Sequence, residues 1–204
     1  MATHRVGVMG GSFDPIHIGH LVAASEAADR FDLDRVVFSP TGEAWHKESD
    51  DRASRELRYL MTVVATAADP RFDVSRVDID RPGPTYTVDT LQDLRTAFAA
   101  EFPGDSAEWF FVTGADALAD ILGWRDPDRI TSVAHLVGVT RPGHVLADPG
   151  LPASQVSLLE IPALAISSTD IRERVRSGQP ITYLVPEGVA HLIQKHGLYR
   201  EAQA

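Results

Sequence analysis

The 204-residue sequence predicts a single α/β domain in which a parallel β-sheet is covered by helices on both faces. Two observations support this prediction. Short apolar runs typical of buried strands alternate along the chain with segments of helical periodicity, which is the order that builds a parallel sheet with helical crossovers. The length fits one domain, and neither a repeat nor a linker divides it, so residues 1–204 are expected to form one unit.

The individual elements follow from local patterns. Strands are predicted where short apolar or alternating runs occur, at residues 6–9, 36–40, 72–79, 109–112, 135–139 and 156–161. Helices are predicted where apolar residues recur at helical spacing, at 17–31, 54–68 and 85–98, after 114, from 167 to Gly178, and in the tail up to 199. Asp69 and Pro70 stop the second helix, and residues 81–84 give a rigid turn. This order of elements predicts a Rossmann-like sheet.

The first strand and the helix after it form the segment around which the rest of the chain is interpreted. Gly10 and Gly11 directly follow the apolar run and predict a tight turn that a ligand could approach closely. After a proline-containing bend, the helical pattern begins at His17. A strand, a glycine turn and a helix start together favour phosphate binding, because free N–H groups and the helix dipole point at the anion.

His17 and His20 are the side chains that distinguish this segment. They stand three residues apart, so a helix places them on one face about one turn apart. Imidazoles beside a phosphate can donate hydrogen bonds to charge that develops on phosphoryl oxygens. Three alternatives stay open at this point: a plain glycine turn, histidines that belong to the core or surface, and histidines that bind a metal. Against the metal, cysteine is absent and no third ligand stands nearby at metal-site spacing.

The composition narrows the class of protein. The formal charge of −10 argues against general nucleic-acid binding, which requires a basic surface. No apolar run is long enough to span a membrane, no signal peptide is recognised, and cysteine is absent, so a cytoplasmic protein is expected. The sequence leaves the oligomeric state open, and a homo-oligomer is compatible with it.

Two common nucleotide-binding patterns are absent. The segment after the first strand is not G-x-G-x-x-G, which disfavours a dinucleotide-dependent oxidoreductase, and no G-x-x-x-x-G-K-[ST] occurs, which disfavours a P-loop enzyme. Residues 10–20 instead resemble the signature of the nucleotidylyltransferase superfamily, in which H-x-G-H follows a G-x-F-D-x-x-H loop. The form Gly-Gly-Ser-Phe-Asp-Pro-Ile-His is similar to that of the bacterial nicotinate mononucleotide adenylyltransferase family. The resemblance extends over nearly the whole chain.

The resemblance implies an ATP site built from both ends of the chain. Residues 166–172 match the superfamily motif Ile-Ser-Ser-Thr-x-Ile-Arg, in which the helix start binds ATP phosphates and Arg172 reaches the β and γ positions. Asp116 would contact a ribose. Purely structural explanations are also available: Ser167 could simply cap a helix, and Asp116 could simply complement a helix dipole. The implied ATP-binding residues are Gly10, Gly11, Ser12, Phe13, His17, His20, Asp116, Ser168, Thr169 and Arg172.

The resemblance also implies a site for nicotinate mononucleotide. Its residues are Ser12, Phe13, His46, Lys47, Thr85, Tyr86, Thr87 and Trp124. His46 and Lys47 end a loop at 40–47 that is usually proline-rich in the family but is not so here; without the resemblance they would suit a solvated loop. Trp124 would stack on the pyridine ring, although an indole is more often part of the core. Thr85 or Thr87 could equally be only a helix N-cap.

The implied reaction transfers AMP from ATP to nicotinate mononucleotide and yields deamido-NAD and pyrophosphate. The acceptor phosphate is already anionic near neutral pH, so positioning and charge stabilisation suffice, with His17, His20, Arg172 and Lys47 as catalytic residues. Mg²⁺ would arrive with ATP, and no metal site made by the protein is expected. The alternatives are a superfamily member that uses CTP or accepts the amide mononucleotide or phosphopantetheine, and a nucleotide-binding regulator that has lost catalysis.

Overall fold

The computed structural model describes residues 1–43, 52–140, 150–162 and 164–200. The strands are β1 (Thr3–Gly11), β2 (Arg35–Pro40), β3 (Phe72–Val74), β4 (Ser106–Gly114), β5 (His135–Thr140) and β6 (Val156–Glu160). The helices are α1 (Ile18–Arg30), α2 (Arg55–Thr66), α3 (Val77–Asp80), α4 (Thr87–Glu101), α5 (Ala115–Ala119), α6 (Pro127–Val133), α7 (Ser168–Arg176) and α8 (Glu187–Lys195), with a 3₁₀ turn at Ile121–Gly123.

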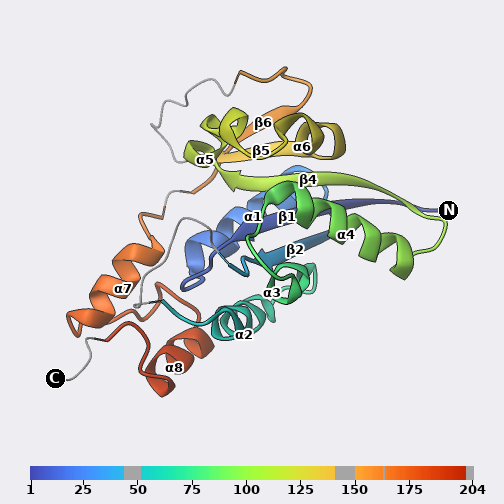
Figure 1. Ribbon diagram of the computed structural model, residues 1–204. Coiled ribbons are helices and arrows are strands. Elements are labelled where there is room, and N and C mark those ends of the chain that lie inside the picture. The colour runs from blue at the N-terminus through green and yellow to red at the C-terminus, as the bar shows by residue number, and fades with distance from the viewer. Residues whose placement is uncertain (44–51, 141–149, 163, 201–204) are drawn as a thin grey trace.

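The strands form one six-stranded parallel sheet in the order β3-β2-β1-β4-β5-β6, which confirms the predicted fold class. The chain builds outward from β1 through β2 to β3, then returns to add β4 on the other side of β1. The strand order therefore reverses between β1 and β4, and open α/β sheets bind ligands outside the carboxyl ends of the strands at such a point. Figure 1 shows α7 at the end toward which the strands point.

The sheet separates two apolar cores, because successive side chains of a strand point to opposite faces. Phe38 and Val112 belong to the core shared with α1, α2 and α8. Their sequence neighbours Val37 and Phe111 belong to the core shared with α4, α5 and α6. In Figure 1, α1 and α4 accordingly lie on opposite faces of the sheet. Both faces are covered, as the near-continuous apolar character of the strands predicts.

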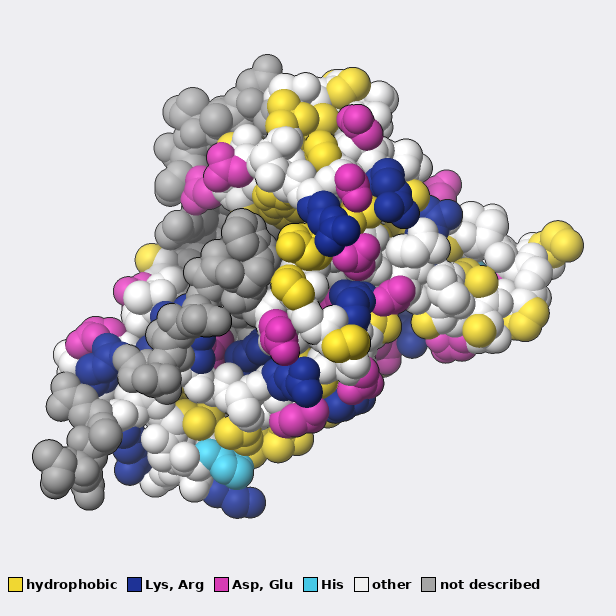
Figure 2. Space-filling model, viewed as in Figure 1, with side chains coloured by type: hydrophobic (Ala, Val, Ile, Leu, Met, Phe, Trp, Pro, Cys, Tyr) yellow, Lys and Arg dark blue, Asp and Glu magenta, His cyan; other side chains and the backbone are white. Residues whose placement is uncertain are grey.

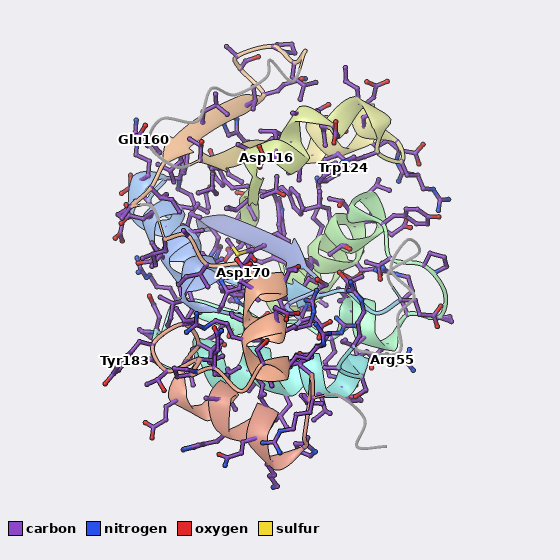
Figure 3. The ribbon with its side chains drawn as sticks, turned by 90° about the vertical axis from the view of Figure 1, so that its left-hand side faces the viewer. Arg55, Asp116, Trp124, Glu160, Asp170 and Tyr183 are labelled. Carbon is purple, nitrogen blue, oxygen red and sulfur yellow. The ribbon has the colours of Figure 1, made fainter. Side chains whose placement is uncertain are left out.

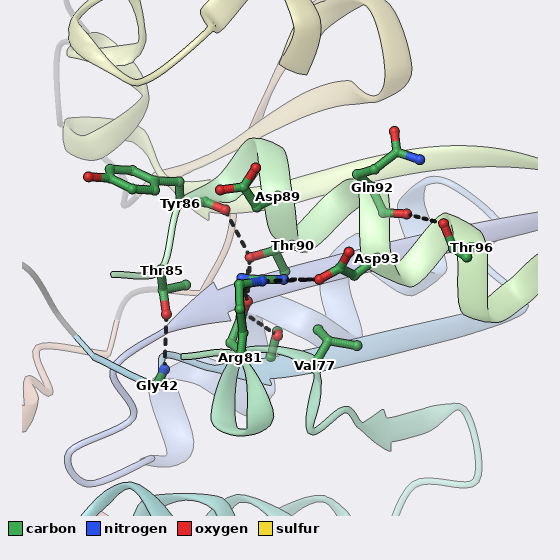
Figure 4. A network of polar contacts seen from close by, with 12 residues as sticks. Gly42, Val77, Arg81, Thr85, Tyr86, Asp89, Thr90, Gln92, Asp93 and Thr96 are labelled. Atoms are coloured by element: carbon green, nitrogen blue, oxygen red, sulfur yellow. Dashed lines mark hydrogen bonds and ion pairs between the residues drawn. The ribbon is translucent and has the colours of Figure 1, made fainter. Parts of the chain in front are cut away.

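The predicted strand at 72–79 is wrong beyond Val74, because the chain turns into the short helix α3. Asp78 on α3 is buried, and its carboxylate accepts hydrogen bonds from Ser39 Oγ at 2.7 Å and from Thr90 Oγ1 at 2.9 Å. Arg81 Nη1 pairs with the same carboxylate at 2.6 Å. Ser39 and Thr90 lie on other elements, so the local alternation of apolar residues carries no sign of them. Figure 4 shows the surrounding polar network.

The predicted glycine turn is also displaced. Gly10 and Gly11 extend β1 and pair with Ser39 and Pro40 of β2, and the sharp bend falls at Phe13, whose φ is 47°. Helix α1 starts at Ile18, with His17 in the N-cap position. The last helix ends at Lys195, short of the predicted limit near 199.

The sequence predicted the N-cap of α7 and left the N-cap of α4 open. Ser167 caps α7 as predicted, since its Oγ accepts from the N–H of Asp170 at 3.1 Å, and Gly178 follows that helix at a φ of 67°. Neither threonine caps α4. The N-cap position is held by Tyr86, while Thr85 Oγ1 accepts from the N–H of Gly42 at 3.1 Å.

The surface mixes both signs of charge. Figure 2 shows basic and acidic side chains side by side over the face that it presents, instead of one large basic patch. Several arginines are paired with carboxylates, among them Arg71 with Asp29 at 2.6 Å and Arg76 with Glu56 at 3.0 Å. Within the described ranges, no helix combines the length and apolar character needed to cross a membrane.

Candidate active site

The carboxyl ends of β1 and β4 border a cavity of about 320 Å³. Its lining includes Gly10 at the end of β1, His17 and His20 at the start of α1, and Asp116 in the first turn of α5. Figure 3 looks onto this edge, with Asp116 and Trp124 above the α7 residue Asp170. The cavity therefore lies at the reversal of strand order, and it brings together four of the residues predicted for the ATP site.

His17 and His20 form a stacked pair, with ring centroids 3.7 Å apart and ring planes 27° apart. Burial lowers the pKa of His17 to about 4. The pKa of His20 also lies well below its ordinary value, first because of burial and then because a charge on His17 would repel a second charge. Both rings are therefore neutral near pH 7, and each carries a single N–H.

The backbone fixes which nitrogen of His20 holds its proton. The N–H of His17 donates to Nδ1 of His20 at 3.2 Å, so Nδ1 presents a lone pair and the proton of the neutral ring resides on Nε2. Phe13 packs edge-on against this ring, with centroids 5.1 Å apart. His20 is thereby held as a neutral hydrogen-bond donor whose N–H is Nε2–H.

Gly19, the glycine of the H-x-G-H core, makes room for the pair. A Cβ at this position would lie 3.1 Å from His17 Nδ1. That nitrogen is buried and has no hydrogen-bond partner within the part of the chain that the structure describes. Any larger residue at position 19 would therefore press on the His17 ring, which explains why the spacing of the motif includes a glycine.

The first turn of α7 is fastened to the loop after β1. Arg172 Nη1 donates to the carbonyl of Asp14 at 2.7 Å, and Arg172 Nη2 donates to Thr169 Oγ1 at 3.2 Å. Ser168 Oγ donates to the carbonyl of Pro15 at 2.9 Å. Segments more than 150 residues apart in the sequence thus meet at one place, as predicted. Arg172 keeps further N–H groups for an anion, since a guanidinium has five, whereas the Ser168 hydroxyl proton is already engaged.

A second cavity of about 370 Å³ brings together the residues predicted for the pyridine ring. Thr85, Tyr86 and Thr87 line it from the start of α4, and Trp124 lines it from the end of the 3₁₀ turn. Trp124 is half-buried and meets Phe111 edge-on at 6.0 Å. Helix α5 contributes to both cavities, through Asp116 to the first and Ala117 to the second. The two cavities therefore flank one short helix.

Arg125 was not predicted as a site residue, yet it lines the second cavity. Its guanidinium lies over the ring of Tyr86 at 4.5 Å from the centroid, and its Nη1 is 3.9 Å from Asp89 Oδ2. The stacking holds a positive charge beside the two threonines. The available signal was its position directly after Trp124, which the sequence reasoning did not use.

Phe13, His46 and Lys47 were also predicted to be site residues. The side chain of Phe13 is buried in the core, so a ligand contact by Phe13 has to use its backbone. His46 and Lys47 lie outside the described residues.

Asp14 is a further residue whose role was not predicted. Its carboxylate is fully buried and accepts from Tyr199 Oη at 2.7 Å and from the N–H of Ala53 at 3.2 Å. Burial and the neighbouring Asp14 raise the pKa of Tyr199, so the phenol remains the proton donor. Because the carbonyl of Asp14 also accepts from Arg172, the C-terminal Tyr199 helps to fix the backbone that holds the predicted phosphate ligand.

Within the described ranges, no group of three or more His, Asp or Glu side chains is arranged to hold a metal ion.

Residues 8–174 match the family model described as Cytidylyltransferase-like, and the chain belongs to this family. Family membership places the protein among enzymes of the nucleotidyltransferase class and confirms the resemblance seen at residues 10–20.

Relatives narrow the class further. A protein of Acidothermus cellulolyticus named probable nicotinate-nucleotide adenylyltransferase is 63% identical over 96% of this chain and 94% of its own length. A protein of Streptomyces coelicolor with the same name is 62% identical over 94% of this chain and 99% of its own. The Plasmodium falciparum nicotinic acid mononucleotide adenylyltransferase complexed with NaAD has the same fold, with a TM-score of 0.73 at 19% identity over 96% of this chain and 97% of its own.

Proposed function

We propose that the protein transfers AMP from ATP to the phosphate of nicotinate mononucleotide and releases deamido-NAD and pyrophosphate. The observation that carries this proposal is the pair of cavities on either side of α5. One is lined by the neutral His17 and His20, and the other by Trp124 and the threonines that begin α4. A phosphate-binding compartment beside a compartment for an aromatic ring matches a reaction that joins two nucleotides.

On the nucleotide side, the chain supplies donors for each part of the triphosphate. Arg172 and the N–H groups at the start of α7 would hold the β and γ phosphates, while His20 Nε2–H would donate to the phosphoryl group that is transferred. Asp116 would accept from ribose hydroxyls. ATP would arrive as its Mg²⁺ complex, and the metal would be held mainly by phosphate oxygens and water.

The chemical step needs no general base. A phosphate oxygen of nicotinate mononucleotide attacks the α-phosphorus of ATP, a new P–O bond forms, and the bond from that phosphorus to the bridging oxygen breaks as pyrophosphate leaves. The attacking oxygen is already anionic near neutral pH, so the protein contributes alignment and stabilisation of charge. Neutral histidines suit this role, since they donate hydrogen bonds without having to take up a proton.

On the mononucleotide side, Trp124 would stack on the pyridine ring, and the groups at the start of α4 would meet its carboxylate. Thr85 Oγ1 accepts from the N–H of Gly42, so its own proton remains free to donate to an anion. Arg125 adds a positive charge at the same cavity. His46 and Lys47 would act from the segment between Gly42 and Ala53. We also propose a cytoplasmic location, since the reaction consumes ATP.

Pyrophosphate release tests the proposal directly. The purified protein is incubated with Mg²⁺ and either ATP or CTP, together with nicotinate mononucleotide, its amide analogue or phosphopantetheine. Rapid release is expected only with ATP and a pyridine mononucleotide, with the acid preferred. Release with phosphopantetheine, or release that depends on CTP, would assign a different activity of the family. Nucleotide binding without release from any pair would indicate a regulator.

A further inference from the structure

Arg58 is a buried cation on the inner face of α2. Its side chain is only 7% exposed, and its three kinds of guanidinium nitrogen each donate to a main-chain carbonyl. Nη1 donates to Ser12 at 2.7 Å, Nη2 to Gly42 at 3.0 Å and Nε to Ala53 at 3.3 Å. Burial lowers the pKa of Arg58, and the charge of Asp14 opposes this effect. A buried charge with three bonds to backbone is costly to place, which points to a specific purpose.

The three carbonyls belong to different parts of the site. Ser12 lies in the loop that follows β1, while Gly42 and Ala53 stand on either side of residues 44–51. One guanidinium therefore joins three loop positions that helix or strand hydrogen bonds do not connect. Because a peptide unit is planar, directing the Ser12 carbonyl toward Arg58 directs the N–H of Phe13 away from it. Arg58 thus fixes the direction in which the N–H of Phe13 points.

Gly42 transmits this restraint to the second cavity. Its N–H donates to Thr85 Oγ1 at 3.1 Å, and the N–H of Thr85 donates back to the carbonyl of Glu43 at 3.1 Å. The joint is tight, since a Cβ on Gly42 would lie 2.0 Å from the carbonyl oxygen of Asp78. Figure 4 shows the hydrogen bond between Gly42 and Thr85 beside the polar network around Arg81. A shift of Gly42 would therefore displace Thr85 at the entrance of α4.

Ala53, on the C-terminal side of residues 44–51, is the third position held by Arg58. Its N–H donates to Asp14 Oδ1 at 3.2 Å, and its carbonyl accepts from Arg58. The peptide groups at Ala53 are thus held by a buried anion and a buried cation. An arginine suits this position, because its planar fork reaches acceptors in several fixed directions, whereas a lysine ammonium is a single point.

We propose that Arg58 is a positioning residue for nicotinate mononucleotide, acting through Gly42 and Thr85 without touching the substrate. The inference rests on the proposed function, since it names the substrate of the second cavity. It requires that loss of the fork affect the mononucleotide more than ATP, because Arg172 and α7 are tied to Asp14 and Pro15 by other bonds.

The test compares Arg58→Lys with Arg55→Lys, a matched change at an exposed arginine of the same helix. Arg58→Lys keeps the buried positive charge but not the planar fork of donors. We expect its KM for nicotinate mononucleotide to rise about tenfold, the size of one hydrogen bond lost at a site, while KM for ATP changes by less than about threefold. Arg55→Lys should match the wild type in both. An equal rise in both KM values, or none, would overturn the proposal.

Two further measurements keep the inference testable if Arg58→Lys folds poorly or if the substrate assignment fails. Gly42→Ala disturbs the same joint with Arg58 intact, so it should give the same selective rise in KM. Amide hydrogen exchange at Gly42 and Ala53, followed by NMR without substrate, should be faster in Arg58→Lys than in Arg55→Lys. Exchange at the wild-type rate would refute a positioning role whatever the substrate is, whereas lack of turnover by the wild type would refute only the proposed function.

Discussion

The buried state of His17 makes a quantitative prediction about acid. In the unfolded chain a histidine takes up a proton near its ordinary pKa of 6.5, whereas burial holds the pKa of native His17 at about 4. Between these values the unfolded state binds more protons, so the free energy of unfolding falls as the pH falls. Each pH unit corresponds to about 1.4 kcal/mol, so acidification through this window should remove about 3 kcal/mol through His17 alone. His20 acts in the same direction.

Urea unfolding of the wild type and His17→Gln between pH 7.5 and pH 4 measures this effect, since the carboxylates that titrate in both proteins cancel in the difference. The wild type should lose about 3 kcal/mol more than the variant, with most of the loss below pH 6. His191→Gln, which removes a largely exposed histidine of α8, should lose stability in parallel with the wild type. A His17→Gln protein that tracks the wild type at every pH would show that the stacked pair is not held neutral by burial.

Three further predictions concern activity. His20→Gln should lower kcat about a hundredfold with little change in either KM, because the Nε2–H donor acts mainly on the transition state; unchanged kcat would remove His20 from the mechanism. Arg172→Ala should weaken ATP binding about tenfold in calorimetric titrations, since a charged donor to phosphate is lost, and an unaltered Kd would contradict its role. Arg125→Gln should reduce the preference for the acid over the amide mononucleotide about tenfold in kcat/KM; a constant ratio would leave discrimination to backbone groups and Thr85.

Where the sequence predicted correctly, the signal was local. Ser167 caps α7 by accepting a hydrogen bond from the N–H of Asp170, which stands only three residues later. The strands carry the apolar runs that a sheet covered on both faces requires. The meeting of α7 with the loop after β1 was predictable only through the family motif, because no local pattern links Arg172 to Asp14 across 158 residues.

Where the sequence predicted wrongly or not at all, a distant partner decided the outcome. The strand expected through Ile79 gives way to α3 because Asp78 reaches Ser39 and Thr90. Thr85, for which a role as N-cap of α4 was one alternative, instead accepts a hydrogen bond from the N–H of Gly42. Nothing in the sequence around Arg58 distinguishes it from any other arginine of an amphipathic helix. Its role depends on three carbonyls that only the folded chain brings together.

The same geometry explains how an acidic protein can handle two anionic substrates. Two largely buried rings stacked 3.7 Å apart cannot both be charged without strong repulsion, so burial and stacking together favour neutral histidines. Under the proposed function they would contribute directed hydrogen bonds, and positive charge would come from Arg172, the start of α7, Lys47, Arg125 and the metal carried with ATP. Arginines elsewhere such as Arg71 and Arg76 are paired with carboxylates, which reduces their field at the cavity. The net charge of −10 describes the whole chain and does not set the local field at the cavity, where the fold places the proposed donors.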